Sequence, residues 1–595
     1  MKDFKKANKK MYCKKSVYFL MLFFELFFSL CFSSCDFLLK DEEKKATIEE
    51  EPTKVAVWEK SDFFYDSIID LEKMNVNSEK ITFPKKTGKV FLLKSNNPSG
   101  NKNNDWVLAT KTGWVENYTK KERSSQILQN SFQNSKEFYE KEILPNSTKS
   151  LEQNNQSKNV PYIKEFEKAR QFEQNPLLYL NKSRATTIEG GGSTQKGENE
   201  FYIFNKNEES VPVEFEKKAT GTHCEVYYVS EKDSDYSNFT AKQLNEKISE
   251  TDLRNLVTAF DKIYDKETKI FSSTQDTSIK NSTDSFFIES SASDPIKILV
   301  FDIDQDSKYN QTSGTFGYFY GADIYKQSAL KEKSNEGKII YIDDYFLKKD
   351  EKTVYSTLAH EYQHLLCFLN KTVRQNVLEI PTWYTEMLSM VCEDYMITDT
   401  GNIRSITNMK ENPLYSRLYT FTSNYYLGFE TWYSGNDVLS SYANAYTFGA
   451  FLVRNFNGTS LIKEIISNPY AGKESIIKAV NKISGKNFSF SEIVDGFSEC
   501  LLATDDETSM YSLNKEFDGI FLSEINLYEN IEDGERYPAI FSPFKEDGRV
   551  PLGVGGFSLH YIGKNILEIN FSLPKDPNVH FVLLYEPEYY YKKGN

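Results

Sequence analysis

The chain has 595 residues, of which 39% are hydrophobic and 15% aromatic, and its formal net charge is −14 at pH 7. Single hydrophobic cores stop growing at about 250 to 300 residues, so this length excludes one small domain and predicts several packed units. The negative charge argues against nucleic acid or an anionic membrane surface as a partner.

The first residues of the chain are typical of a bacterial secretion signal. Seven lysines precede an apolar run that ends at Phe32, and two serines stand directly before Cys35. This order predicts a lipoprotein-type signal peptide over residues 1–34, cleaved so that Cys35 becomes lipidated. We therefore expect a protein of the bacterial cell envelope, outside the cytoplasm and attached to a membrane by lipid. An uncleaved anchor or plain secretion is the alternative, because Glu25 interrupts the apolar run.

Removal of this signal changes the net charge from −14 to −19, because it takes away seven lysines and two acids. Beyond Cys35 the mature chain keeps only four cysteines, which are Cys224, Cys367, Cys392 and Cys500. So few cysteines in so long a chain exclude a disulfide-rich scaffold.

Composition divides the chain before the central region into three parts. Residues 35–53 carry runs of charged side chains and predict a solvated tether. Residues 54–118 contain short strand-like runs separated by Asn, Gly and Pro, and predict a small β unit. Residues 119–200 are polar and end in three consecutive glycines, so a linker with helical segments is predicted there.

The end of the chain is predicted to be a β domain over residues 506–595. Apolar runs at 556–562, 566–571 and 579–584 alternate there with turn residues. The small β unit at 54–118 is a candidate to complete this domain.

The most informative segment contains His360-Glu361-Tyr-Gln-His364. On a helix, His360 and His364 lie one turn apart on the same face, where two neutral imidazoles can bind one metal ion. Zinc held by three protein ligands keeps a fourth position for water and lowers the pKa of that water to about 7. Glu361 is then placed to accept the proton. The motif predicts a zinc hydrolase, and a histidine pair buried in a core helix is the structural alternative.

The third ligand is predicted to be a carboxylate. A longer, all-histidine motif would need Gly at 367 and His at 370, where the chain has Cys367 and Asn370. Glu386 is the best candidate, because a proline five residues upstream is well suited to begin a helix that carries it. Among its rivals, Glu379 precedes that proline, and Glu393 is interpreted as an outer partner of the site or a surface residue.

At this point the chain resembles the hyicolysin family of bacterial metallopeptidases, which belong to the gluzincins. The resemblance covers about residues 215–460 and rests on short blocks that follow one another in the family's order. The blocks are Ala219–Val229, Phe260–Tyr264, Phe301–Asp304, Gly317–Phe319, Ile340–Asp343, the zinc motif, Trp383–Ser389 and Tyr442–Phe456.

This resemblance implies an α+β, zincin-like catalytic domain over residues 201–505, with a mixed sheet, an active-site helix and a mostly helical second lobe. It implies zinc (Zn2+) ligands at His360, His364 and Glu386, with Glu361 as general base, the same four residues that the spacing indicates. One departure is Met390, where some gluzincins carry an aspartate that orients the first histidine. The outer partner of His360 is therefore not predicted.

A peptidase also needs a hydrogen-bond donor for the oxyanion that forms during hydrolysis. Tyr442 and Tyr446 lie one turn apart on a predicted helix, and Tyr446 is preferred. Ordinary core packing is the alternative for both tyrosines.

The strand at 338–343 precedes the zinc motif and is the candidate to pair with an extended peptide substrate, provided that it lies at the edge of its sheet. An interior strand is the alternative. The acidic run at 302–306 resembles the start of a calcium loop, but Ser313 stands where the loop needs its last glutamate, so a structural role is preferred.

Together these features predict a zinc-dependent endopeptidase that acts on proteins or peptides outside the cytoplasm. The alternative from another class is a catalytically silent surface lipoprotein that binds or adheres through a peptidase scaffold. A zinc hydrolase of another bond is a third hypothesis, because the preference for peptides rests on the family resemblance. The sequence leaves open the oligomeric state and whether residues 35–200 inhibit the enzyme.

Overall fold

The structure is a computed structural model, and it describes part of the chain. The described residues are 68–70, 79–82, 87–96, 107–109, 115–117, 162–163, 166–181, 199–241, 247–280, 286–307, 313–400, 417–433, 438–500, 550–564, 568–571 and 579–587. The chain divides into two compact units, Met1–Lys54 and Val55–Asn595, and every described residue belongs to the second. The predicted signal peptide, Cys35 and the charged tether lie outside the described residues.

A six-stranded mixed sheet forms the centre of the molecule, with the strand order β12-β13-β10-β9-β8-β7. Strands β9, β10 and β13 run parallel to one another, and the other neighbours are antiparallel. The strands are β7 (Glu200–Phe204), β8 (Ser210–Thr220), β9 (Cys224–Val229), β10 (Ile296–Phe301), β12 (Gly317–Phe319) and β13 (Ile339–Asp343). All five residues of β13 are buried, as expected for a parallel strand covered on both faces.

The strand before the zinc motif is an interior strand, so the condition for its pairing with a substrate is not met and the stated alternative holds. β13 pairs with β10 on one side and with β12 on the other, so its backbone groups are already used within the sheet. The end strand on this side is β12, which pairs with β13 through Gly317, Tyr318 and Phe319. The short strand β12, which precedes β13 in the sequence, therefore forms the edge of the sheet on this side.

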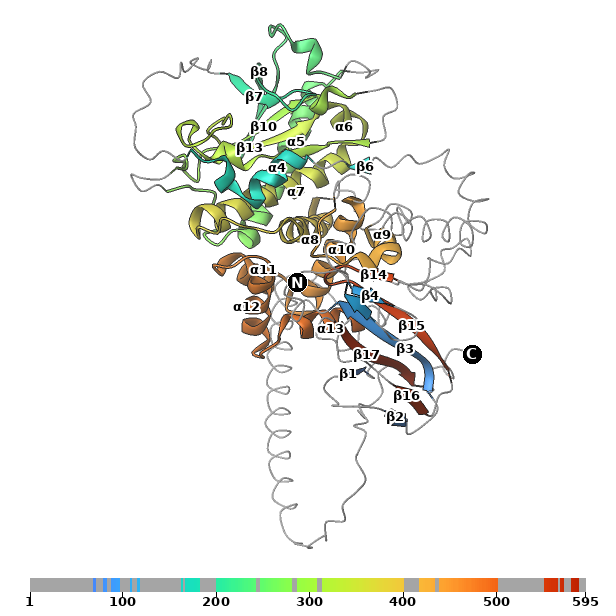
Figure 1. The fold of residues 1–595 in the computed structure, drawn as a ribbon. Helices are drawn as coiled ribbons and strands as arrows, with labels where there is room; N and C mark the ends of the chain where they lie inside the picture. The colour runs from blue at the N-terminus through green and yellow to red at the C-terminus, as the bar shows by residue number, and fades with distance from the viewer. Residues whose placement is uncertain are drawn as a thin grey trace, which may run out of the picture. The chain divides into compact units, whose positions relative to one another are not determined.

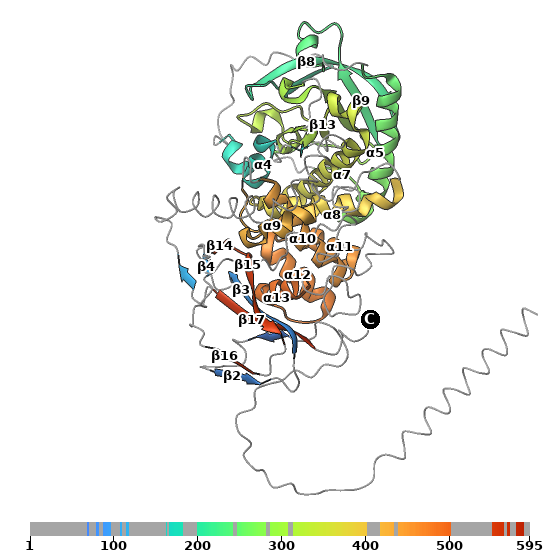
Figure 2. The ribbon, with the colours of Figure 1, turned by 90° about the vertical axis from the view of Figure 1, so that its right-hand side faces the viewer.

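Helices cover the sheet and extend away from it. Figure 1 and Figure 2 show α7 between the sheet and the helices α8 and α10, and α7 also packs against α5. The helices are α4 (Glu167–Gln174), α5 (Glu250–Phe271), α6 (Asp344–Lys349), α7 (Glu351–Phe368), α8 (Thr382–Thr400), α9 (Arg417–Asn424), α10 (Val438–Asn455), α11 (Gly458–Ser467), α12 (Gly472–Ser484) and α13 (Phe490–Cys500). Short 3-10 turns are η2 (Pro176–Tyr179), η3 (Tyr236–Asn238), η4 (Ile303–Gln305), η5 (Gly321–Ile324), η6 (Gln327–Ala329) and η8 (Tyr425–Leu427).

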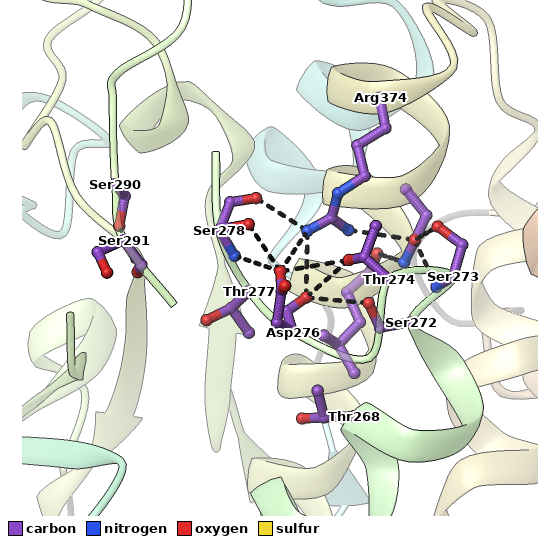
Figure 3. Close-up of polar contacts among 12 residues, drawn as sticks. Thr268, Ser272, Ser273, Thr274, Asp276, Thr277, Ser278, Ser290, Ser291 and Arg374 are labelled. Atoms are coloured by element: carbon purple, nitrogen blue, oxygen red, sulfur yellow. Dashed lines mark hydrogen bonds and ion pairs between the residues drawn. The ribbon is translucent and has the colours of Figure 1, made fainter. Parts of the chain in front are cut away.

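Both ends of α7 are fixed by polar side chains. Asp350 caps the first turn, because its carboxylate accepts from the backbone N–H of Thr353. At the other end a π-helical turn, η7 (Leu369–Arg374), continues the helix. There Arg374 Nη2 donates to the carbonyl oxygens of Asp276 (3.1 Å) and Ser278 (2.9 Å), a network drawn in Figure 3. These contacts hold the helix that carries the histidine motif against the loop after α5.

The two terminal β regions share their sheets. A four-stranded sheet has the order β1-β17-β3-β15, a three-stranded sheet the order β14-β4-β5, and β16 pairs with β2. The strands are β1 (Ile68–Asp70), β2 (Glu79–Thr82), β3 (Thr87–Asn96), β4 (Val107–Ala109), β5 (Val115–Asn117), β14 (Val550–Leu552), β15 (Phe557–Lys564), β16 (Glu568–Phe571) and β17 (Val579–Pro587). Each of these sheets thus joins strands from before residue 118 to strands from after residue 549.

The described residues confirm the predicted α+β class. A further pair, β6 (Tyr162–Ile163) and β11 (Ser313–Gly314), is parallel and lies outside the central sheet. Cys224, Cys367, Cys392 and Cys500 are buried thiols without a disulfide. No helix within the described ranges is both long and apolar enough to cross a bilayer.

Candidate metal centre

Two histidines and one glutamate bring three donor atoms to one point. Nε2 of His360 lies 3.1 Å from Nε2 of His364 and 3.0 Å from Oε2 of Glu386, and Nε2 of His364 lies 3.4 Å from Oε1 of Glu386. The histidines come from α7 and the glutamate from α8, which pack against each other. The structure therefore places the three predicted ligands together.

The donor set fits zinc. Two imidazoles and one carboxylate are the protein ligands of a familiar class of catalytic zinc site, in which metal–ligand distances are about 2.0 to 2.2 Å. One ligand atom from each of the three residues lies within 4.8 Å of the other two, a separation at which they can surround an ion. Within the described residues, this is the one cluster of His, Cys, Asp and Glu whose ligand atoms converge, and the acidic run at 302–306 is not part of one.

Burial and neighbouring charges shift the pKa values of His360 and Glu386 in opposite directions. Burial lowers the pKa of His360, but hydrogen bonds to Glu386 and Glu393 outweigh it and raise that pKa to about 10. Burial raises the pKa of Glu386, yet Arg170 and the two histidines hold it well below its usual value. Glu386 is therefore a carboxylate, and a metal ion entering the site displaces a proton from histidine.

Glu393 is the outer partner of His360 that the sequence left unassigned. Its Oε1 lies 2.7 Å from Nδ1 of His360, and its Oε2 accepts a 2.6 Å hydrogen bond from the hydroxyl of Ser356. A carboxylate on Nδ1 keeps the proton there and turns Nε2 toward the metal position. Of the two interpretations of Glu393, the contact with His360 favours the outer partner, and an exposure of 4% excludes the surface residue.

Glu361 lies beside the metal ligands and is held by the end strand of the sheet. Its Oε2 accepts a 2.9 Å hydrogen bond from the backbone N–H of Phe319 in β12. Glu361 is buried, with an exposed fraction of 3%. This position agrees with the role of general base that the motif predicts.

Arg170 is the residue of this site that sequence reasoning missed. Its Nη2 donates to both carboxylate oxygens of Glu361, at 3.1 and 3.0 Å, and its Nε lies 2.5 Å from Oε1 of Glu386. Its neighbour on α4, Glu173, lies 3.3 Å from Nδ1 of His364. Arg170 belongs to the segment predicted as a polar linker, where no spacing or motif marked it.

Comparison with known proteins identifies the family of this centre. A sequence model of the peptidase M30 family matches residues 217–520, which is more than half of the chain. The chain belongs to the peptidase M30 family. The neutral metalloprotease ShpI of Staphylococcus hyicus is 29% identical to it over an alignment of 224 residues, and the match covers 35% of this chain and 46% of that relative. The chain thus matches less than half of the length of this relative.

The M30 match divides the residues of the centre into two groups. His360, Glu361, His364, Glu386 and Glu393 lie within the matched range, which confirms the family resemblance stated from the sequence. Arg170 lies outside this range, 47 residues before it begins. This chain therefore brings a side chain from beyond the family region to the metal ligands.

The two tyrosines of α10 occupy different surroundings. The hydroxyl of Tyr446 donates a 2.6 Å hydrogen bond to the buried carboxylate of Asp394. Asp394 stands eight residues beyond Glu386 on α8, and this bond occupies the hydroxyl of Tyr446. The ring of Tyr442 instead lies 6.4 Å from the ring of His360. These contacts favour Tyr442 over the predicted Tyr446 as the candidate oxyanion donor.

Proposed function

We propose that this protein is a zinc-dependent endopeptidase that hydrolyses proteins or peptides outside the cytoplasm. The observation that carries the proposal is the convergence of His360, His364 and Glu386 on one point, with Glu361 beside it. Membership in a peptidase family supports peptides as the substrate class.

His360, His364 and Glu386 would hold the zinc ion through their converging donor atoms. Bound zinc would supply a Lewis acid that polarises the substrate carbonyl and acidifies water. Glu393 fixes the ring of His360 from behind, so that Nε2 faces the ion. The packing of α7 on α8 keeps all three ligands in place before metal arrives.

Glu361 acts as general base and takes a proton from the attacking water. Its carboxylate is positioned by the N–H of Phe319 on β12, and both of its oxygens also accept from Arg170. A tyrosine of α10 donates to the oxyanion of the tetrahedral intermediate. Tyr442 suits this role better than Tyr446, because Tyr446 is bonded to Asp394.

Peptide substrates would bind along β12, the end strand beside Glu361. An extended peptide can pair with the backbone of an end strand, which holds its carbonyl groups in register without selecting a sequence. Lipidation of Cys35 would keep the enzyme at the cell envelope, and plain secretion is the alternative.

Metal content and cleavage of casein by the purified protein test this function, with Glu361→Gln as the matched variant. Both proteins should bind about one zinc per chain, because the ligands are unchanged. Only the wild type should cleave, and a chelator should abolish that cleavage, since loss of a general base costs about 100-fold or more in rate. Absence of zinc binding from both proteins would refute the proposal and favour the silent binding lipoprotein.

A further inference from the structure

Helix α4 reaches the metal centre from outside the region that matches the family. It begins at Glu167, whereas the match begins at residue 217. Arg170 on this helix contacts Glu361 and Glu386, and Glu173, one turn later, lies 3.3 Å from His364. One helical turn thus contacts three of the four residues that the proposed function needs.

The charge of Arg170 opposes both of the tasks assigned to the carboxylates. Nη2 of Arg170 donates to both carboxylate oxygens of Glu361, the atoms that would accept the proton of the attacking water. The same guanidinium lies 2.5 Å from Oε1 of Glu386 and competes there with a metal ion. Arg170 is 6% exposed, and ion pairs in such surroundings are only weakly screened by salt.

Aromatic packing anchors α4 on both sides of Arg170. The ring of Phe166 stacks on Tyr318 with centroids 4.2 Å apart. The ring of Phe172 is fully buried and lies 5.4 Å from the ring of Tyr320 and 5.7 Å from that of Tyr325. Burial of these two phenylalanine side chains stabilises the packing of α4 against the residues around the site.

Backbone hydrogen bonds hold the segment at its two ends. Before α4, β6 pairs in parallel with β11. After α4, the N–H of Asn181 donates to the carbonyl of Ala329 at 3.0 Å, and its side-chain amide donates to the carbonyl of Leu330 at 3.0 Å. The helix is therefore fixed at the site by contacts before and after it.

The segment also covers the strand along which a substrate would bind. Tyr318, on which Phe166 stacks, belongs to β12, and β11 ends only three residues before β12 begins. A peptide that pairs with β12 would have to occupy the place of Phe166 and the start of α4. Arg170 thus blocks the proposed catalytic carboxylates, and Phe166 blocks the strand along which the substrate would bind.

We propose that residues 162–181 are a built-in inhibitor of this enzyme, in which α4 covers the substrate strand and Arg170 occupies the catalytic carboxylates. This inference rests on the proposed endopeptidase function. The active form then requires α4 to leave the site, because the segment occupies the place beside β12 that a peptide substrate would take.

Arg170→Ala tests the inhibitor by removing the guanidinium while leaving every proposed catalytic residue in place. We expect the initial rate of casein cleavage to rise about tenfold or more, since the site-bound form loses the contacts that favour it. Zinc affinity, measured by competition with a chromogenic indicator, should also rise because the cation competing for Glu386 is gone. Phe172→Ala weakens the anchor without touching the site and should raise the rate in the same direction.

Lys168→Ala is the matched control, since it removes one positive charge from the same helix. The Lys168 ammonium lies away from the metal ligands, 3.6 Å from Glu332 and over the ring of Phe204. This variant should change the rate less than Arg170→Ala does. Thermal unfolding of each variant shows whether the molecule remains folded.

The outcomes separate the inhibitor from the proposed function. If wild type cleaves casein and Arg170→Ala cleaves equally or more slowly, the inhibitor is refuted while the peptidase stands. A faster rate in both Arg170→Ala and Phe172→Ala supports the inhibitor, whatever the change in zinc affinity. If no variant cleaves, the proposed endopeptidase function has failed. Tighter zinc binding by Arg170→Ala would then still show that Arg170 blocks the metal ligands, whereas unchanged zinc binding would refute the inhibitor as well.

Discussion

Oε1 of Glu393 lies 2.7 Å from Nδ1 of His360, and this contact joins two residues separated by 33 positions in the chain. Because α7 and α8 pack side by side, a carboxylate two turns beyond the third ligand reaches the back of the first ligand. The metal centre is thus supported from α8 twice, by Glu386 on the metal side and by Glu393 behind His360.

Glu393→Gln should weaken zinc binding about 10- to 100-fold, because the amide supports the imidazole less strongly than the carboxylate does. Competition with a chromogenic zinc indicator measures this change. Glu379→Gln is the control, since Glu379 is exposed and was only a rival candidate for the third ligand. Equal zinc affinity of the two variants would show that Glu393 does not support the ligand.

Tyr442→Phe should lower kcat for casein peptides by about 100-fold with little change in KM, because an oxyanion donor acts on the transition state. Tyr446→Phe should retain kcat and lower the free energy of unfolding by about 1 to 3 kcal/mol, since it removes a hydrogen bond from the buried Asp394 carboxylate, which keeps its ion pair with Arg454. Steady-state kinetics and thermal unfolding of both variants check this. A larger loss of kcat in Tyr446→Phe would restore the preference drawn from the sequence.

Gly449→Ala should destabilise the contact between α10 and α8. A Cβ at this position would lie 2.7 Å from Cγ of Met387 and 2.8 Å from Cγ2 of Val391, closer than van der Waals contact allows. We expect a loss of about 1 to 3 kcal/mol in the free energy of unfolding, together with weaker zinc binding, because Met387 adjoins Glu386. Denaturant unfolding measures the loss of stability, and competition with a chromogenic indicator measures zinc binding. Gly337→Ala should be nearly neutral, since its added Cβ meets no atom within 3.4 Å.

The stability of the protein should fall as pH rises toward 7, in part because of Glu430. Burial raises the pKa of this carboxyl to about 7, although the ammonium of Lys473, 2.5 Å away, lowers it in part. The folded state therefore holds a proton that the unfolded chain releases near pH 4.5, so the stabilisation is complete below that pH and is lost as pH rises through 7.

Glu430→Gln should remove up to about 3 kcal/mol of this pH dependence. The unfolding midpoint in urea, measured between pH 4.5 and 8, is the readout. Glu474→Gln is the control, because its side chain is exposed on the same side of the molecule. An unchanged pH profile in Glu430→Gln would contradict the assignment.

Much of the centre follows from local spacing. His360, Glu361 and His364 are set by the period of one helix, and Glu386 by a helix start that a proline marks, so neighbouring residues decide their geometry. The α+β class likewise follows from the mixture of apolar runs and helical patterns. Tyr446 was preferred over Tyr442 because two residues one turn apart on a helix cannot be separated without knowing what packs against each.

The sequence by itself identified the family and the candidate ligands and base, because the helical repeat and a set of short motifs express them within a few residues. Only the tertiary structure decided the order of strands in the sheet, which places β12 rather than β13 at the end. It also decided the contact of Arg170 with Glu361, across 191 positions. Such contacts depend on how separate segments pack, and no local pattern records which buried carboxylate a distant arginine will meet.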